Sequence, residues 1–325
     1  MQTRCTRRGF LAVAGAAGLV VASGCSSAGT GAGEQDSGEV NIAHAFGKTT
    51  VPGPPQRVVS AGFTEQDDLL AVGIVPIATT EWFGGEPFAV WPWARAALGD
   101  AQPEVLNLAD GIQLDRIAAL KPDLIVATNA GVDADTYARL SAIAPTIPQS
   151  GSDAFFEDWK DQANTIAIAT YQRDAMKSLI TAIDDKFAAI GAEHPQFKDK
   201  KVLLLAGTPW HGAVTATLPG WRTEFLTQMG LVIPDTLGSY TEGNRARIPV
   251  DQLPSAVDDA DVVIWTTESD AEQAALLADP AIAELGTRNV FTTRELAAAI
   301  AFATPLSYPV VADQLPPLLE RALGD

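Results

Sequence analysis

Short, continuously apolar segments alternate with helix-like segments along the first half of this chain. Residues 57–60, 74–78 and 124–127 read as strands, whereas residues 64–72 and 114–120 space their apolar positions as helices do. Strands that are apolar on both faces are typical of a parallel sheet covered by helices on each side. The sequence therefore predicts an α/β fold.

The same alternation returns in the second half. Residues 201–206, 261–265 and 289–291 read as strands, residues 223–229 as a helix and residues 310–323 as a closing helix. Between the halves, residues 158–193 contain almost no Gly or Pro and repeat apolar residues at helical spacing. This pattern predicts two small parallel-sheet lobes joined by one long helix, which a short break can interrupt.

The first residues resemble an export signal. Residues 6–11 read Thr-Arg-Arg-Gly-Phe-Leu, an apolar run follows, and residues 22–25 read Ala-Ser-Gly-Cys. We interpret residues 1–24 as a twin-arginine lipoprotein signal peptide and Cys25 as the lipidated residue, followed to residue 54 by a flexible tether and an N-terminal strand. The alternative, a transmembrane anchor, is disfavoured because residues 9–24 fall short of the roughly 18–20 apolar residues that a span needs. The expected location is the outer face of the cytoplasmic membrane.

Charge and cysteine content exclude several classes of protein. The formal net charge is −18; removing residues 1–24 deletes Arg4, Arg7 and Arg8 and no acid, which makes it −21. Such a body repels nucleic acid, so no nucleic-acid partner is expected. The two cysteines are Cys5 and Cys25, which leaves the rest of the chain without a disulfide or a cysteine metal site.

Enzyme motifs are missing from the sequence. It has no G-x-S-x-G elbow, no phosphate-loop motif and no H-E-x-x-H pair. The three histidines, His44, His194 and His211, lie far apart in the sequence, so neither a resident metal nor a cofactor is expected. An exported hydrolase of unknown type remains an alternative on this evidence.

Candidate binding residues follow the predicted strands or lie in nearby loops. Ligands of parallel α/β sheets bind at the carboxyl ends of the strands. Aromatic rings recur at these ends, and arginines in the second half offer guanidinium groups that suit carboxylate or catecholate. The alternatives are that the rings fill the core and that the arginines are solvated. The candidates are Phe63, Glu81, Trp82, Phe83, Trp91, Trp93, Trp210, His211, Arg222, Tyr240, Arg245 and Arg247.

Several segments resemble the iron-siderophore substrate-binding lipoproteins of ABC importers. The most specific is residues 114–125, which end in Lys-Pro-Asp-Leu-Ile, and supporting matches occupy residues 55–60, 65–77, 137–146, 223–231 and 249–253. The resemblance implies an N-terminal lobe over residues 55–157, a rigid inter-lobe helix over 158–195 and a C-terminal lobe over 196–325. It also implies a ligand cleft between the lobes.

The resemblance further implies a function and partners. Members of this family bind a ferric siderophore outside the membrane and offer one surface carboxylate per lobe to arginines of the permease. By motif position these carboxylates are Asp115 and Asp251, although glutamate is commoner there and an acid at a helix start has a structural explanation. The acidic body suits a neutral or cationic hydroxamate chelate, and a monomer is expected.

Haem is the alternative ligand on the same fold, because the resembled family includes haem binders. A haem site needs an axial ligand, usually His or Tyr. The candidates near predicted cleft loops are His211, Tyr240 and Tyr308.

Overall fold

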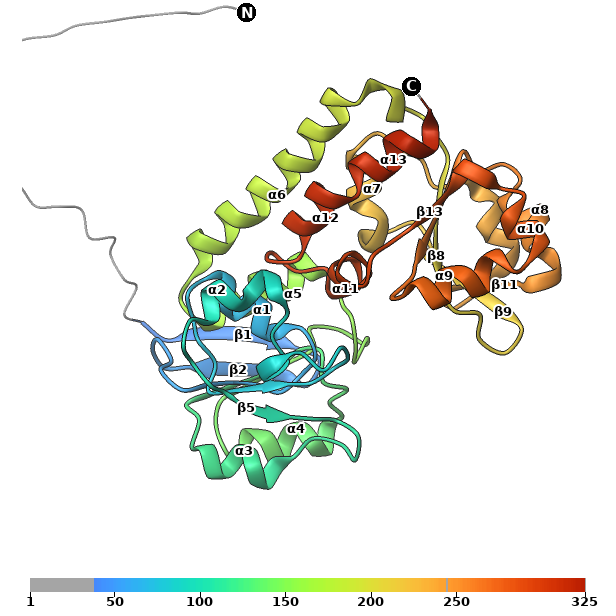
Figure 1. Ribbon diagram of the computed structural model, residues 1–325. Coiled ribbons are helices and arrows are strands. Elements are labelled where there is room, and N and C mark those ends of the chain that lie inside the picture. Colours follow the sequence, from blue (N-terminus) through green and yellow to red (C-terminus); the bar gives the residue numbers. More distant parts are fainter. Residues whose placement is uncertain (1–37, 244, 325) are drawn as a thin grey trace, which may run out of the picture. The chain divides into compact units, whose positions relative to one another are not determined.

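The computed structural model describes residues 38–243 and 245–324 (Figure 1). The predicted signal peptide, Cys25 and most of the tether lie outside these residues. The described chain begins with an antiparallel hairpin of β1 (Val40–His44) and β2 (Gly47–Val51). Its tight turn contains Gly47 at a φ of 122°, a conformation that favours glycine.

The first lobe contains a five-stranded parallel sheet in the order β5-β4-β3-β6-β7. Its strands are β3 (Val58–Ser60), β4 (Ala78–Thr80), β5 (Glu104–Leu106), β6 (Leu124–Ala127) and β7 (Thr146–Pro148). Its helices are α1 (Glu65–Ala71), η1 (Pro87–Ala89), η2 (Pro92–Ala94), α2 (Arg95–Leu98), α3 (Leu114–Leu120) and α4 (Ala134–Ser141).

Both faces of this sheet are buried, as its continuously apolar strands predict. Successive side chains of a strand point to opposite faces. In β6, Ile125 joins one core cluster with Ile117 of α3, whereas Leu124 joins another with Leu69 of α1. The sheet therefore lies between two layers of apolar side chains.

One strand of the first lobe was predicted in the wrong place. Residues 74–77 are not a strand; the N–H of Ile74 donates instead to the carbonyl of Leu69 at 2.9 Å, which keeps the chain turned after α1. The strand begins at Ala78, so Thr79 and Thr80 belong to β4 rather than to the loop after it.

The segment between the lobes forms two helices, α5 (Trp159–Ala169) and α6 (Arg173–Glu193). The break falls at residues 170–172, where the hydroxyl of Thr170 donates to the carbonyl of Ile166 at 2.8 Å. Helix α5 packs against α1 of the first lobe, and α6 packs against α7 and α12 of the second. The apolar period continues across the break, which explains why the sequence reads as one helix.

The second lobe contains a six-stranded sheet in the order β10-β11-β9-β8-β12-β13. Strands β8, β12 and β13 are parallel, as predicted, whereas β9, β10 and β11 extend the sheet in antiparallel fashion. The strands are β8 (Val202–Ala206), β9 (Ala213–Ala216), β10 (Thr241–Glu242), β11 (Arg245–Pro249), β12 (Val262–Thr266) and β13 (Asn289–Phe291). The sheet is thus mixed, and its antiparallel half was not predicted.

Helices cover this second sheet and complete the chain. They are η3 (Pro195–Phe197), η4 (Trp221–Thr223), α7 (Glu224–Gln228), η5 (Asp235–Tyr240), η6 (Val250–Gln252), α8 (Leu253–Val257), α9 (Asp270–Leu277), α10 (Pro280–Ala283), η7 (Gly286–Arg288), α11 (Arg294–Phe302), α12 (Tyr308–Gln314) and α13 (Pro316–Leu323). The predicted closing helix is split because Pro316 lacks the N–H that a continuous helix needs.

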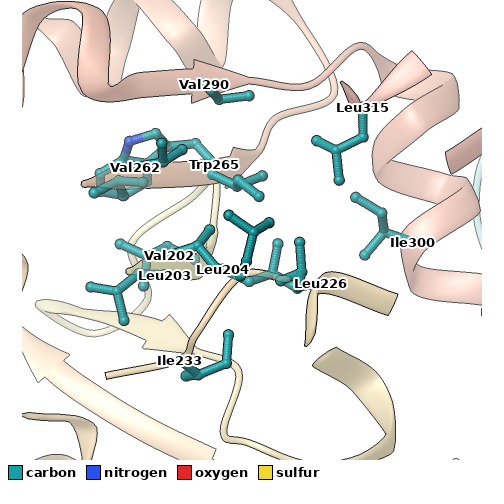
Figure 2. Packing of buried hydrophobic residues seen from close by; sticks show 14 of the residues in the cluster. Val202, Leu203, Leu204, Leu226, Ile233, Val262, Trp265, Val290, Ile300 and Leu315 are labelled. Atoms are coloured by element: carbon teal, nitrogen blue, oxygen red, sulfur yellow. The ribbon is translucent and has the colours of Figure 1, made fainter. Parts of the chain in front are cut away.

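The core of the second lobe forms around β8 and β12 (Figure 2). Val202, Leu203 and Leu204 of β8 lie beside Val262 and Trp265 of β12 in this cluster. The indole N–H of Trp265 donates to the side-chain oxygen of Asn289 at 2.8 Å, which satisfies the one polar group of a fully buried ring.

Candidate functional site

A cavity of about 540 Å³ brings together residues of both lobes. From the first lobe, it is lined by loop residues that follow β3, β4 and β7; from the second, by residues of β9, η4, β11 and α11. The lining residues are Phe63, Trp82, Phe155, Phe156, Thr215, Ala216, Thr217, Arg222, Arg245 and Ala301. The first-lobe residues therefore lie where the strand-end rule predicts.

Stacked aromatic rings form the first-lobe wall. The ring of Phe63 lies between those of Trp82 and Phe155, with centroid distances of 5.6 and 5.7 Å and interplanar angles of 21° and 18°. Gly131 makes room for this arrangement, because a Cβ there would lie 2.3 Å from the ring of Phe155. The wall offers flat, apolar surface to a ligand.

Two arginines contribute positive charge to the cavity. The guanidinium of Arg222 lies over the rings of Phe156 and Trp221, at 5.0 and 4.3 Å from their centroids. Neither Arg222 nor Arg245 belongs to an ion pair among the described residues. The pKa of Arg222 is lowered to about 10, mainly by burial; the phenol of Tyr308 acts in the opposite direction, and the nearby charge of Arg245 also lowers it.

A pKa of about 10 leaves Arg222 charged at neutral pH. An incompletely hydrated cation with no protein counter-ion is stabilised by any anion that enters beside it. The cavity is therefore suited to a ligand that combines flat apolar surface with negative charge.

Several predicted site residues pack into the protein beside the cavity. Trp91 is only 2 % exposed and stacks on Trp93, while the indole N–H of Trp93 donates to Asp67 at 2.7 Å. Phe83 packs on Trp82, and Glu81 accepts a hydrogen bond from the N–H of Gly85. None of these predicted residues lines the cavity, so the core interpretation fits Trp91 and Trp93 better.

The remaining predicted residues of the second lobe also lie away from the cavity lining. Trp210 is 67 % exposed and His211 follows it, whereas Arg247 donates to the carbonyl of Trp210 at 3.3 Å. Tyr240 is partly buried against the second-lobe core. Tyr308 is 2 % exposed and packs edge-on against Trp159, in the interior of the protein.

The two predicted docking acids lie on the surface. Asp115 is exposed in the first turn of α3, and Asp251 is exposed in η6. Each is thus accessible to a partner from its own lobe.

Sequence reasoning missed Phe155 and Phe156. They lie in the loop after β7, a strand that was not predicted, so this strand end was not searched. A signal was present, because an aromatic pair in a loop rich in Gly, Ser and Asp resembles the setting of Trp82. The side-chain oxygen of Asn129 accepts from the N–H of Phe156 at 3.0 Å and fixes the loop.

The polar residues near the cavity do not form a metal centre. Within the described ranges, no group of three or more His, Cys, Asp or Glu side chains is arranged to hold a metal ion. In that same part of the chain, no helix has both the length and the apolar character required to cross a membrane.

Comparison with known proteins places the chain in a family. The model of a family described as periplasmic binding protein matches residues 59–292. The chain belongs to this periplasmic binding protein family. The family resemblance read from the sequence is thereby confirmed, and the family consists of substrate-binding components of transporters.

Individual relatives agree with this assignment. The periplasmic binding protein is 30% identical to YhfQ of Bacillus subtilis, whose name describes an ABC transporter substrate-binding lipoprotein, over 76% of each chain. It is 28% identical to the Fe(3+)-citrate-binding protein YfmC of the same organism, over 57% of this chain and 58% of that one.

A solved structure confirms the predicted fold class. The crystal structure of a periplasmic solute binding protein from Mycobacterium smegmatis is 63% identical, with a TM-score of 0.84. The match covers 89% of this chain and 100% of that one.

Proposed function

We propose that this protein captures a ferric siderophore outside the cytoplasmic membrane and delivers it to an ABC importer. The observation that carries the proposal is a cavity lined by aromatic rings and by two arginines that have no ion-pair partner among residues 38–243 and 245–324. A relative named for binding ferric citrate supports iron as the cargo. The iron arrives wrapped by its chelator, so the protein needs no metal ligands of its own and makes or breaks no bond.

The local charge of the cavity favours an anionic chelate. The body without residues 1–24 carries a formal net charge of −21, which alone suits a neutral or cationic hydroxamate. At contact distance, however, Arg222 and Arg245 act through a partly dehydrated cavity, whereas the distant acids are screened by salt within roughly 10 Å. We therefore place anionic chelates, catecholate or carboxylate, ahead of hydroxamates.

Haem is disfavoured by the positions of its candidate axial ligands. His211 is exposed, Tyr308 lies in the interior and Tyr240 is not among the lining residues. In the described part of the chain no His or Tyr lines the cavity, so these residues offer haem iron no axial ligand there.

The remaining parts of the proposal concern attachment and docking. We propose that the protein acts as a monomer, held at the outer face of the membrane by lipid on Cys25 after twin-arginine export. Asp115 and Asp251, exposed on separate lobes, would meet arginines of the permease. Their exposure supports this role.

Titration of the purified protein tests the ligand. Ferric complexes of a tricatecholate, of citrate and of a trihydroxamate, together with haem, would be added while tryptophan fluorescence is recorded. We expect saturable quenching by an anionic ferric chelate at or below about micromolar concentration. The variant Trp82→Phe keeps an aromatic wall and should bind with reduced quenching. Quenching by haem alone, or by none of the ferric chelates, would contradict the proposal.

A further inference from the structure

A second cavity, of about 490 Å³, lies in the second lobe and is lined by other residues than the ligand cavity. Val214 of β9 lines it, whereas its neighbour Thr215 lines the ligand cavity. The two cavities have no lining residue in common. The second cavity therefore needs an explanation of its own.

The walls of this cavity are mainly apolar. They come from the β8–β9 loop, from η6 and from helices α8, α9 and α10. Figure 1 labels these three α-helices in the same part of the molecule. The acidic side chains among them already have partners: Glu272 accepts from Thr208 at 2.5 Å, and Asp279 accepts from the N–H of Ala281 at 2.9 Å. The rest of the cavity is therefore suited to an apolar group.

The segment that supplies most of the cavity lining is rich in acidic residues. Residues 250–287 contain nine acidic residues and no Lys or Arg. Only Asp259 and Asp261 of these take part in ion pairs within the described residues, with Lys201 and Lys200. Arg247 donates to the carbonyl of Trp210 at 3.3 Å, so one cation of this chain lies beside the segment. A partner with positive charge would complement the other seven acids. The nine acids are Asp251, Asp258, Asp259, Asp261, Glu268, Asp270, Glu272, Asp279 and Glu284.

An exposed tryptophan adjoins the cavity. Pro209 lines it, and the next residue, Trp210, is 67 % exposed. The backbones of Trp210 and Ala213 exchange hydrogen bonds at 2.8 and 3.1 Å, which holds this loop in place. Burying a large aromatic ring from such a position is a common source of binding energy in protein interfaces.

We propose that the second cavity, Trp210 and Asp251 form one docking surface for the importer permease, here called the acidic socket. Its occupant is an outward-facing loop of the permease in which an apolar side chain fills the cavity and a neighbouring Arg or Lys meets the acids. The inference rests on the proposed function, because a binding protein of an importer must contact its permease. A second copy of this chain fits poorly, since both copies carry a charge of −18.

Filling the cavity tests the socket in the full-length, lipid-anchored protein. Ala274 and Ala275 of α9 are both exposed, but only Ala275 lines the cavity. We expect Ala275→Phe to lower uptake of radioactive iron, supplied as ferric citrate or as the ferric tricatecholate, at least about tenfold. The matched variant Ala274→Phe should leave uptake unchanged, and neither variant should alter the dissociation constant for the chelate.

A photo-crosslinking residue at position 275 supplies a second measurement, with position 274 as its control. We expect a covalent adduct with a permease subunit from position 275 only, and Trp210→Ser should weaken it. Normal uptake by Ala275→Phe, or adducts only with lipid, with small molecules or with another copy of this chain, would overturn the socket. If wild-type protein neither binds the chelates nor supports uptake, the proposed function itself is contradicted. Failure of the proposed function can therefore be told apart from failure of the socket alone.

Discussion

Arg222 is the residue on which the charge preference of the ligand cavity most depends. Its guanidinium lies over two aromatic rings, the residue is partly buried, and it has no ion pair in the described chain. We expect Arg222→Gln to weaken binding of an anionic ferric chelate about 10- to 100-fold, because a charged hydrogen bond contributes about 1.5–3 kcal/mol. Fluorescence titration measures the change.

The matched control for this prediction is Arg247→Gln. Arg247 lies 4.0 Å from Glu242 and does not line the cavity, so its loss should change affinity little. Equal losses from both variants would show that general surface charge, rather than the cavity, attracts the ligand.

Glu65 affects how stability depends on pH, because its carboxyl group has no exposed surface. Burial raises its pKa to about 7, although hydrogen bonds from Asn129, Thr128 and Thr64 act in the opposite direction. Its neighbours on α1, Asp67 and Asp68, also have pKa values raised by burial, that of Asp67 to about 6. The folded protein therefore holds protons that the unfolded chain releases.

The pH dependence of stability follows from this difference. Between the unfolded pKa of about 4.5 and the folded pKa of about 7, the folded state binds more protons, so the free energy of unfolding falls as pH rises through this range. We expect Glu65→Gln to reduce that fall by about 2–3 kcal/mol, since each pKa unit corresponds to about 1.4 kcal/mol. Urea unfolding at about pH 5 and about pH 8 measures it. The exposed control Glu284→Gln should retain the wild-type slope, and an unchanged slope in Glu65→Gln would contradict the assignment.

At the scale of elements, α11 connects the second lobe to the aromatic loops of the first. Phe302 at its end packs on Trp82 and Trp93, with centroid distances of 5.3 and 5.5 Å. At its start, Arg294 pairs with Glu86 at 3.0 Å. Helix α11 thus packs against Trp82, which lines the ligand cavity, and helps to hold this ring in place.

Truncation of Phe302 tests this support. We expect Phe302→Ala to lower the free energy of unfolding by about 3–5 kcal/mol, the usual cost of removing a buried Phe ring. It should also weaken chelate binding, because Trp82 loses the ring that holds it. Phe302→Leu, which keeps most of the volume, should restore both; loss of stability with unchanged binding would show that α11 does not position the wall.

The elements that the sequence predicts well are those with a strong local pattern. Helix α3 and strands β6 and β13 occupy the predicted residues, because each combines an apolar run with a clear break beside it. Strands β9 and β11 alternate buried with less buried residues beside a parallel core, and β10 has only two residues. Their pairing depends on neighbours distant in sequence, so local patterns did not reveal them.

Across the whole molecule, the strand-end rule located part of the ligand cavity but not the orientation of its rings. Phe63 and Trp82 lie at the cavity, as expected from the strands that they follow. Trp91 lies in the same loop region as Trp82, yet it turns inward because Phe302, more than 200 residues later, completes a buried cluster around it. A sequence pattern cannot show which side of a loop such a distant residue will cover.

The net charge of the whole molecule predicts how fast an anionic ligand arrives. The body without residues 1–24 has a formal charge of −21 and repels an anionic chelate at long range, although Arg222 and Arg245 attract it at contact. Salt screens the long-range repulsion more than the contact attraction, because the Debye length falls from about 30 to about 10 Å as ionic strength rises from about 0.01 M to about 0.1 M. The association rate should therefore rise several-fold over this range. Stopped-flow quenching measures this rate, and an uncharged ferric trihydroxamate serves as the control that should show no salt dependence. A rate that falls with salt would mean that the arginines extend an attractive field beyond the cavity and outweigh the acidic body.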